Sequence, residues 1–493
     1  MDRRRAGIIL HPISLPGRED IGTLGREARN FLAFLHHSGQ TLWQILPLGP
    51  TGFGDSPYQC FSAFAGNPLM IDLAELPGLP PESEDQGDAR PGPTEIDYGS
   101  LIPKKFGALG IAAERFQSSA EAAVRSRFEE FRTQQAYWLE DFALFMALKG
   151  HHGGRPWTEW APDLVQREPS AMQRARTELK SEIRSIEVQQ FFFEEQWSVL
   201  KTEANRLGIQ IIGDMPIFVA FDSADVWANP ELFHLDAKGL PTMVAGVPPD
   251  YFSATGQLWG NPLYRWERME QAGFPWWTAR FKRAFELTDI VRIDHFRGFE
   301  SYWSVPAGAP TAESGKWLPG PGSALFEVVQ ERLGPQSIIA EDLGVITPEV
   351  DQLRIGQGYP GMTVLQFAFD GEATNRYLPH NHEPMTVVYT GTHDNDTTQG
   401  WFDSLPEHQK NNVRRYLGHA LMDPPWDLMR VAQQSVARYA IVPMQDVLRR
   451  GAESRMNRPG QAGGNWSWRF TWEQVYFGLQ DELLELTRTY GRA

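Results

Sequence analysis

Three short apolar runs in the second half of the chain each lead into a carboxylate side chain. The runs and their carboxylates are 290–293 with Asp294, 337–340 with Glu341, and 386–389 with Asp394 a few residues further on. β-Branched residues are frequent in these runs, as is typical of strands buried on both faces of a parallel sheet. Successive carboxylates lie about 50 residues apart, which accommodates one strand–loop–helix unit of roughly 30 or more residues and a modest loop. We therefore expect a parallel barrel with these carboxylates at the C-terminal ends of its strands.

Eight candidate strands follow one another in the order that such a barrel requires. They cover 7–10, 42–46, 208–213, 290–293, 337–340, 362–367, 386–389 and 439–442. Between the first two, residues 24–37 carry apolar side chains at helical spacing, and Gly39 follows as a C-cap. The predicted fold class is α/β, a (β/α)8 TIM barrel with large, mostly helical and loop insertions between strands and no C-terminal all-β module.

The long segments between strands define the expected domain organisation. Residues 1–493 are expected to form a single barrel with two insertions. The first, about 49–201 after strand two, has amphipathic helical patterns with an aromatic stripe that we assign to its core. The second, about 215–285 after strand three, is predicted to be loop-like and rich in aromatic residues, with Asp214 delivered at the end of that strand. The C-terminal loop and helix, 455–493, are expected to close the barrel.

Charge and cysteine content limit the classes of partner. The chain has 46 Lys and Arg against 62 Asp and Glu, a net charge of −16, and no long basic run, so we expect neither nucleic acid nor a membrane as a partner. Cys60 is the single cysteine, which excludes an intrachain disulfide and a Cys-based metal site. We see no apolar stretch of about 20 residues and no signal sequence, so we expect a cytoplasmic protein.

Three carboxylates at one barrel mouth allow two kinds of chemistry. They could hold Mg²⁺ or Ca²⁺, or two of them could cleave a glycosidic bond with retention, one as nucleophile and one as proton donor. Arg292, two residues before Asp294, favours the second, because a guanidinium keeps a carboxylate ionised and repels a metal cation. His393, beside Asp394, adds a donor suited to sugar hydroxyls. We therefore predict no metal and no cofactor.

Several motifs together resemble one enzyme family. They are 43–59 (WQILPLGPTGFGDSPYQ), 213–219 (GDMPIFV), 246–252 (GVPPDYF), 256–262 (GQLWGNP), 292–298 (RIDHFRG), 340–344 (AEDLG) and 391–398 (GTHDNDTT). With these motifs the chain is similar, over nearly its whole length, to the 4-α-glucanotransferases. These are the amylomaltases and plant disproportionating enzymes of glycoside hydrolase family 77, a branch of the α-amylase superfamily. The GDSPYQ and VPPDYF segments are the most specific parts of the match.

The resemblance implies a role for each strand-end carboxylate. Asp294 would be the nucleophile that forms a glycosyl ester, and Glu341 would be the general acid and then the general base. Asp394 would bind sugar hydroxyls and stabilise the oxocarbenium-like transition state. The resemblance also implies nine substrate-binding residues: Arg292, His393, Asp214, Tyr58, Trp259, Asn465, Asp250, Tyr251 and Phe252. The last-named trio, Asp250 to Phe252, would lie on a loop over the cleft.

The implied substrates are maltooligosaccharides and α-1,4-glucans of the starch or glycogen type, with a glucan segment transferred to the 4-hydroxyl of an acceptor. Two alternatives remain: a hydrolase with the same three carboxylates, and a non-catalytic barrel that binds glucan. The intact carboxylate trio speaks against the second alternative. Nothing in the trio separates transfer from hydrolysis, since only the acceptor differs. In the 43–59 motif, Phe53 stands where the family is expected to have a tyrosine. This difference bears on the binding of a remote stretch of glucan.

Overall fold

Eight parallel strands form the centre of the protein. The computed structural model describes residues 3–77, 79, 92–249, 254–461 and 463–493. The strands of the parallel sheet are β1 (Arg5–Ile9), β2 (Leu42–Gln44), β3 (Gln210–Pro216), β6 (Ile290–Asp294), β9 (Ile338–Ala340), β10 (Gly361–Val364), β11 (Thr386–Tyr389) and β12 (Tyr439–Pro443). Their order in the sheet is β10-β11-β12-β1-β2-β3-β6-β9. The Ala340 amide donates to the Pro360 carbonyl at 2.9 Å, which brings β9 beside β10 and nearly closes the ring.

The predicted barrel is therefore confirmed, with two corrections to its strands. The third strand runs from Gln210 to Pro216, so Asp214 lies inside it and not at its end. A charge is tolerated there because Arg292 of the neighbouring strand pairs with it. The sixth strand ends at Val364, and the last residues of its apolar run form a 3-10 helix, Leu365–Phe367. Hydrophobicity alone does not mark that change of backbone direction.

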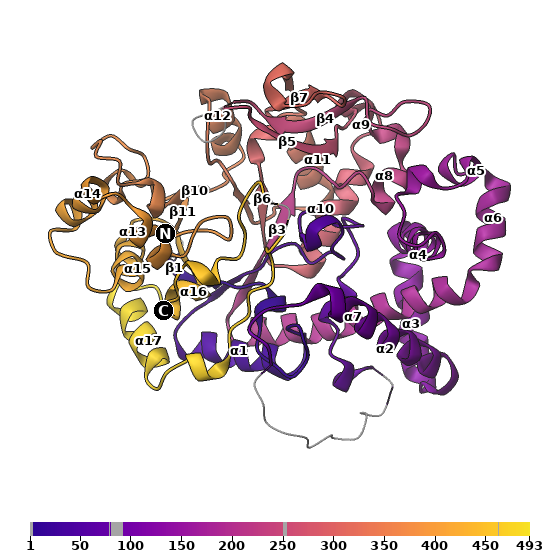
Figure 1. Ribbon diagram of the computed structural model, residues 1–493, viewed down its shortest axis with the longest axis horizontal. Helices are drawn as coiled ribbons and strands as arrows, with labels where there is room; N and C mark the ends of the chain where they lie inside the picture. Colours follow the sequence, from indigo (N-terminus) through magenta and orange to yellow (C-terminus); the bar gives the residue numbers. More distant parts are fainter. Residues whose placement is uncertain (1–2, 78, 80–91, 250–253, 462) are drawn as a thin grey trace.

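Helices surround the barrel, and the long insertion between β2 and β3 is mostly helical (Figure 1). The inserted helices are α2 (Tyr98–Ser119), α3 (Ala122–Gln134), α4 (Ala136–His151), α5 (Pro162–Val165), α6 (Pro169–Glu178) and α7 (Lys180–Arg206). The other helices are α1 (Arg26–His37), α8 (Ala224–Ala228), α9 (Trp266–Gln271), α10 (Pro275–Leu287), α11 (Ser323–Leu333), α12 (Pro348–Gly356), α13 (Thr398–Ser404), α14 (Glu407–Leu417), α15 (Pro424–Gln434), α16 (Met444–Val447) and α17 (Leu479–Thr489). The predicted aromatic stripe of the insertion is buried, as shown by Phe128 and Phe145.

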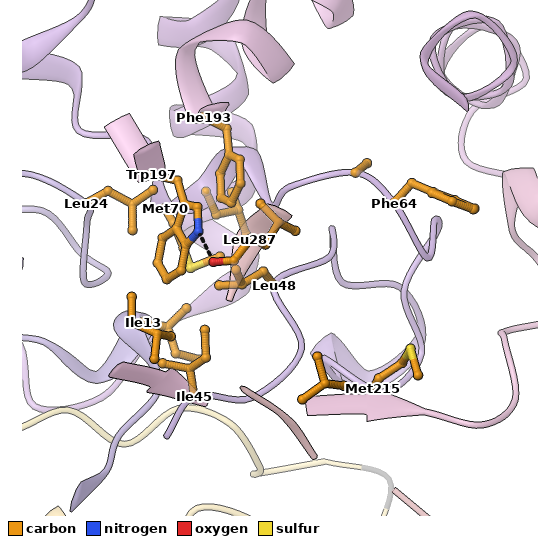
Figure 2. Packing of buried hydrophobic residues seen from close by; sticks show 14 of the residues in the cluster. Ile13, Leu24, Ile45, Leu48, Phe64, Met70, Phe193, Trp197, Met215 and Leu287 are labelled. Atoms are coloured by element: carbon orange, nitrogen blue, oxygen red, sulfur yellow. Dashed lines mark hydrogen bonds between the residues drawn. The ribbon is translucent and has the colours of Figure 1, made fainter. Parts of the chain in front are cut away.

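Helix α7 joins this helical insertion to the barrel. Its Phe193 and Trp197 side chains pack beside Leu48, which follows β2 (Figure 2). The Trp197 indole N–H donates to the Leu287 carbonyl at 2.8 Å, at the end of α10. Because a buried indole N–H needs an acceptor, this bond fixes the depth at which α7 lies against the barrel. The helices at the right of Figure 1 are thereby held to the strands that carry the site.

A second, antiparallel sheet contradicts the prediction that 215–285 is loop-like. It contains β4 (Met243–Val247) and β5 (Gln257–Pro262) from that segment, with β7 (Ser301–Pro306) and β8 (Lys316–Pro319) from the segment after β6. The order is β5-β4-β7-β8. Sequence patterns missed it because its strands contain Gly and Pro, which strands normally avoid, and because β4 finds its partner β7 only after folding.

The C-terminal part of the described chain returns to the first strand. After β12 it forms α16, short 3-10 turns and α17, with no further strand among the residues described. Arg492 is buried and donates to the carbonyls of Arg5, at 3.1 Å, and of Gln433, at 2.8 Å, so the chain end is tied to β1 and α15. Within the described residues, no helix is both long and apolar enough to span a bilayer.

Candidate active site

One guanidinium connects two carboxylates across neighbouring strands. Asp214 of β3 pairs in register with Arg292 of β6, so both side chains point to the same side of the sheet. Arg292 Nη1 lies 2.7 and 2.6 Å from the two carboxylate oxygens of Asp214, and its Nη2 donates to Asp294 Oδ1 at 2.9 Å. Asp294 ends β6, and its side chain is 31% exposed, whereas that of Asp214 is fully buried. Asp294 is therefore the carboxylate of this group that a substrate can reach.

The charge of Arg292 is secured by these two partners. Burial opposes the cation, but Asp214 and Asp294 outweigh it and raise the pKa of Arg292 well above its ordinary value. The side chain therefore remains a cation, with its charge-assisted hydrogen bonds directed at two acids. Arg292 thus places a fixed positive charge beside Asp294.

Tyr58 joins the group formed by Arg292, Asp214 and Asp294. Its hydroxyl donates to Asp214 Oδ2 at 2.8 Å. Burial, followed by the charge of Asp214, raises the pKa of Tyr58 well above its ordinary value, so the hydroxyl stays a neutral donor. The Tyr58 ring stacks on His393, with centroids 5.1 Å apart and planes 18° apart, and Trp466 packs against both rings.

Glu341 follows β9 directly, beside the end of β6. Its Oε2 accepts from the His295 amide at 2.7 Å and its Oε1 from the Leu343 amide at 2.8 Å. His295 has a φ of 54°, a left-handed conformation that turns the chain sharply after the strand. Burial first, and then the charge of Asp294, raise the pKa of Glu341 to about 7, against the opposing effect of Arg292. The carboxyl group therefore keeps its proton up to near-neutral pH.

Asp394 lies on the loop after β11 and is the most exposed of the three predicted catalytic carboxylates. Its side chain is 48% exposed, and its Oδ2 is 3.4 Å from His393 Nε2. The Asn457 amide donates to Oδ1 at 2.6 Å, and Arg455 donates to the Asp394 carbonyl at 2.7 Å. Both of these partners belong to the C-terminal loop and were missed, since the only sequence signal there is a segment rich in Gly, Asn and Trp.

Of the remaining predicted binding residues, Trp259 lies on β5 and Asn465 lies on the C-terminal loop. Trp259 of β5 meets the His295 ring edge to face, at 4.8 Å and 84°, so it lies beside the turn that follows β6. Asn465 uses its amide within its own loop, accepting from the Arg458 amide at 2.9 Å and donating to the Gln461 carbonyl at 2.8 Å. The predicted residues Asp250, Tyr251 and Phe252 lie outside the described residues.

The described part of the chain contains no group of three His, Cys, Asp or Glu side chains placed to hold a metal ion. The acids that cluster here are instead paired with Arg292 or accept hydrogen bonds from backbone N–H groups. Two carboxyl groups at neighbouring strand ends thus have different surroundings. Asp294 accepts a charge-assisted hydrogen bond from Arg292, and burial holds Glu341 as an acid. A parallel barrel with this pair at its mouth belongs to the class of barrel enzymes that cleave glycosidic bonds with two carboxyl groups.

Comparisons with known proteins identify the family. The 4-alpha-glucanotransferase family matches residues 10–474. The chain is 53% identical over 484 residues to a 4-alpha-glucanotransferase of Thermus thermophilus, with 94% of each chain covered. It is 50% identical over 499 residues to one of Synechocystis, with 100% of this chain and 99% of that one covered.

A solved structure agrees with these sequence matches. The amylomaltase from Streptococcus agalactiae in complex with acarbose superposes with a TM-score of 0.94 and 41% identity, and the match covers 100% of both chains. The protein belongs to the 4-α-glucanotransferase family and is a transferase of that class. The resemblance expected from the sequence motifs is confirmed.

Proposed function

We propose that the enzyme moves a segment of an α-1,4-glucan to the 4-hydroxyl of an acceptor sugar through a covalent glycosyl–enzyme intermediate. The observation that carries this mechanism is the pair formed by Asp294 and Glu341. Arg292 donates a charge-assisted hydrogen bond to the first at 2.9 Å, and burial raises the pKa of the second to about 7. A double displacement needs one carboxylate that attacks and one carboxyl group that donates a proton at the same pH.

The two carboxyl groups reverse their tasks between the two halves of the reaction. Asp294 first attacks and is later displaced, and Glu341 first gives a proton and later takes one. In the first, Asp294 attacks the anomeric carbon, the bond to the glycosidic oxygen breaks, and the Glu341 proton goes to that oxygen. In the second, ionised Glu341 removes the proton of the acceptor 4-hydroxyl, whose oxygen displaces Asp294 from the anomeric carbon. Two inversions give net retention. Asp294 is regenerated as a carboxylate, and Glu341 regains its proton.

We assign the surrounding residues according to what each can reach. Asp394, which is exposed, and His393, which is buried beside it, lie on the loop after β11 and would bind the hydroxyls of the transferred sugar. Asp214 is fully buried and paired with Arg292 and Tyr58, which supports a role in holding Arg292 in place. Tyr58 and Trp259 would contact the transferred sugar with their rings. Asp250, Tyr251 and Phe252 remain proposed parts of a loop over the cleft.

The proposed substrates are maltooligosaccharides and α-1,4-glucans of the starch or glycogen type. Support comes from the similar amylomaltase, whose structure contains bound acarbose. We also propose a cytoplasmic location, where a protein whose single cysteine is a free thiol meets reducing conditions.

One incubation separates transfer from hydrolysis. With maltotriose as the only substrate, transfer gives glucose together with a ladder of longer maltodextrins. Hydrolysis with the same carboxylates gives only shorter products. Chromatography of the products over time distinguishes the two. Loss of maltotriose without any longer product would contradict the proposed function.

Asn457 provides a prediction about Asp394. Asn457→Ala removes the donor at 2.6 Å from Asp394 Oδ1 and should lower kcat/KM for glucan transfer about tenfold, the effect of one charge-assisted hydrogen bond. Asn457→Asp should be more harmful, because it places a second carboxylate against Asp394. Steady-state kinetics of both variants, with circular dichroism to check folding, test this. Equal kinetics for the wild type and both variants would contradict the assignment.

A further inference from the structure

A second histidine lies behind His393 at the mouth of the barrel. His11 follows β1 and precedes a 3-10 helix, Pro12–Ser14. It is 2% exposed, and His393 is 7% exposed. Within the described part of the chain, the Nδ1 atoms of both rings are buried and have no hydrogen-bond partner. Buried polar atoms are nearly always hydrogen-bonded in native proteins, so two unpartnered ring nitrogens at one site require an explanation.

A cavity of about 30 Å³ touches both rings. A polar cavity of roughly 10–15 Å³ is enough to hold one water molecule. The residues that line the cavity include His11, Thr392, His393, Asn395, Asp396 and Gln445. Its wall is therefore partly polar, with hydroxyl, amide and carboxylate groups beside the two imidazoles. A site of this size and polarity has room for a water molecule with several polar partners.

We propose that His11 is a positioning residue that fixes the tautomer of His393 through one water molecule bound in this cavity. His11 Nδ1–H donates to the water oxygen, and a water O–H donates to His393 Nδ1. The His393 proton is then confined to Nε2, the nitrogen that lies 3.4 Å from Asp394 Oδ2. The second water hydrogen is available to the lining oxygens of Gln445 or Asp396.

The protonation state of His11 supports this arrangement. Burial, followed by the nearby His393, lowers the pKa of His11 to about 3. His11 is therefore neutral near neutral pH, with a single N–H to donate. The charged groups around the two rings are Asp394 and Asp396 on the same loop, Asp214 from β3 and Arg455 from the C-terminal loop.

The consequence for the reaction rests on the proposed role of His393 in binding sugar hydroxyls. With the proton on Nε2, His393 offers a donor toward Asp394 and the bound sugar. With the proton on Nδ1, a bare nitrogen lone pair would face the Asp394 carboxylate, and that donor would be lost. A preorganised donor also needs no rearrangement at the moment of reaction.

Two substitutions test the proposal. His11→Leu removes the donor, whereas His11→Asn keeps an amide N–H close to the position of Nδ1. In protein labelled with ¹⁵N-histidine, the ring nitrogens of His393, assigned by comparison with His393→Asn, should report a proton on Nε2 in the wild type. His11→Leu should give a mixture of tautomers and about a tenfold lower kcat for transfer from maltotriose. His11→Asn should restore both within about threefold.

The outcomes separate this inference from the function on which it rests. An unchanged His393 tautomer in His11→Leu overturns the inference, whatever the kinetics. Equal loss of activity in His11→Leu and His11→Asn, together with equally lowered thermal midpoints, indicates a purely structural residue and also overturns it. Full activity of His393→Asn would instead overturn the proposed sugar-binding role of His393, and the nitrogen shifts would still decide whether His11 controls the ring.

Discussion

Asp294→Asn should lower kcat for glucan transfer by at least about 10⁴-fold, because an amide cannot form the glycosyl ester. The fold should survive, since the side chain is 31% exposed and its one described hydrogen bond is to Arg292, which keeps Asp214 as a partner. Steady-state rates with maltotriose and thermal unfolding of the same preparation measure the two effects separately.

Asp289→Asn is the matched control for that variant. Asp289 immediately precedes the same strand and accepts from the Ile211 amide at 2.8 Å and from Asn205 at 2.9 Å. Its replacement should alter stability slightly and leave kcat near the wild-type value. If Asp294→Asn kept more than about 1% of wild-type turnover, the assignment of the nucleophile would be wrong.

Glu341→Gln should lower kcat for maltotriose by about 10³-fold or more, because the amide can neither give nor take the proton. A glucosyl donor with an acidic leaving group needs no proton in the first step, so this step should be nearly normal. The second step still lacks its base. A glycosyl–enzyme adduct should therefore accumulate, and mass spectrometry of the intact protein should detect it.

The pH dependence gives an independent check on Glu341. The acid must be protonated for the first step, and its pKa is raised to about 7. Wild-type kcat/KM for maltotriose should therefore fall as pH rises through about 7, approaching tenfold per pH unit above it. Glu349→Gln, an exposed acid at the start of α12, should keep this decline. A decline that persists unchanged in Glu341→Gln with the activated donor would assign it to another group.

The barrel was predictable because its signal is local. The runs at 290–293 and 386–389 are apolar at nearly every position, which reflects burial on both faces and needs no knowledge of neighbours. Glu341 and Asp294 could be recognised as a pair because each follows such a run directly. The motifs around them then pointed to the family, and the comparisons agree.

The missed features all depend on contacts between distant segments. Asn457 reaches Asp394 across 63 residues of sequence, from a loop without periodic pattern. Asp214 was expected at a strand end, and its place inside β3 depends on Arg292, 78 residues away. The antiparallel sheet requires β4 to pair with β7, on the far side of β6 in the chain. No local propensity contains this information.

The pairing of β1 with β12 also has a consequence for synthesis of the chain. Arg5 pairs with Tyr439, so the first strand meets one of its two neighbours only after more than 400 further residues have been made. At roughly 5–20 residues per second, a ribosome needs on the order of 20–90 s for that length. Throughout this interval one edge of β1 has unpaired N–H and C=O groups, which can pair with strands of other chains. The growing chain therefore passes through a period of exposure to misassembly that ends when β12 emerges and the barrel closes.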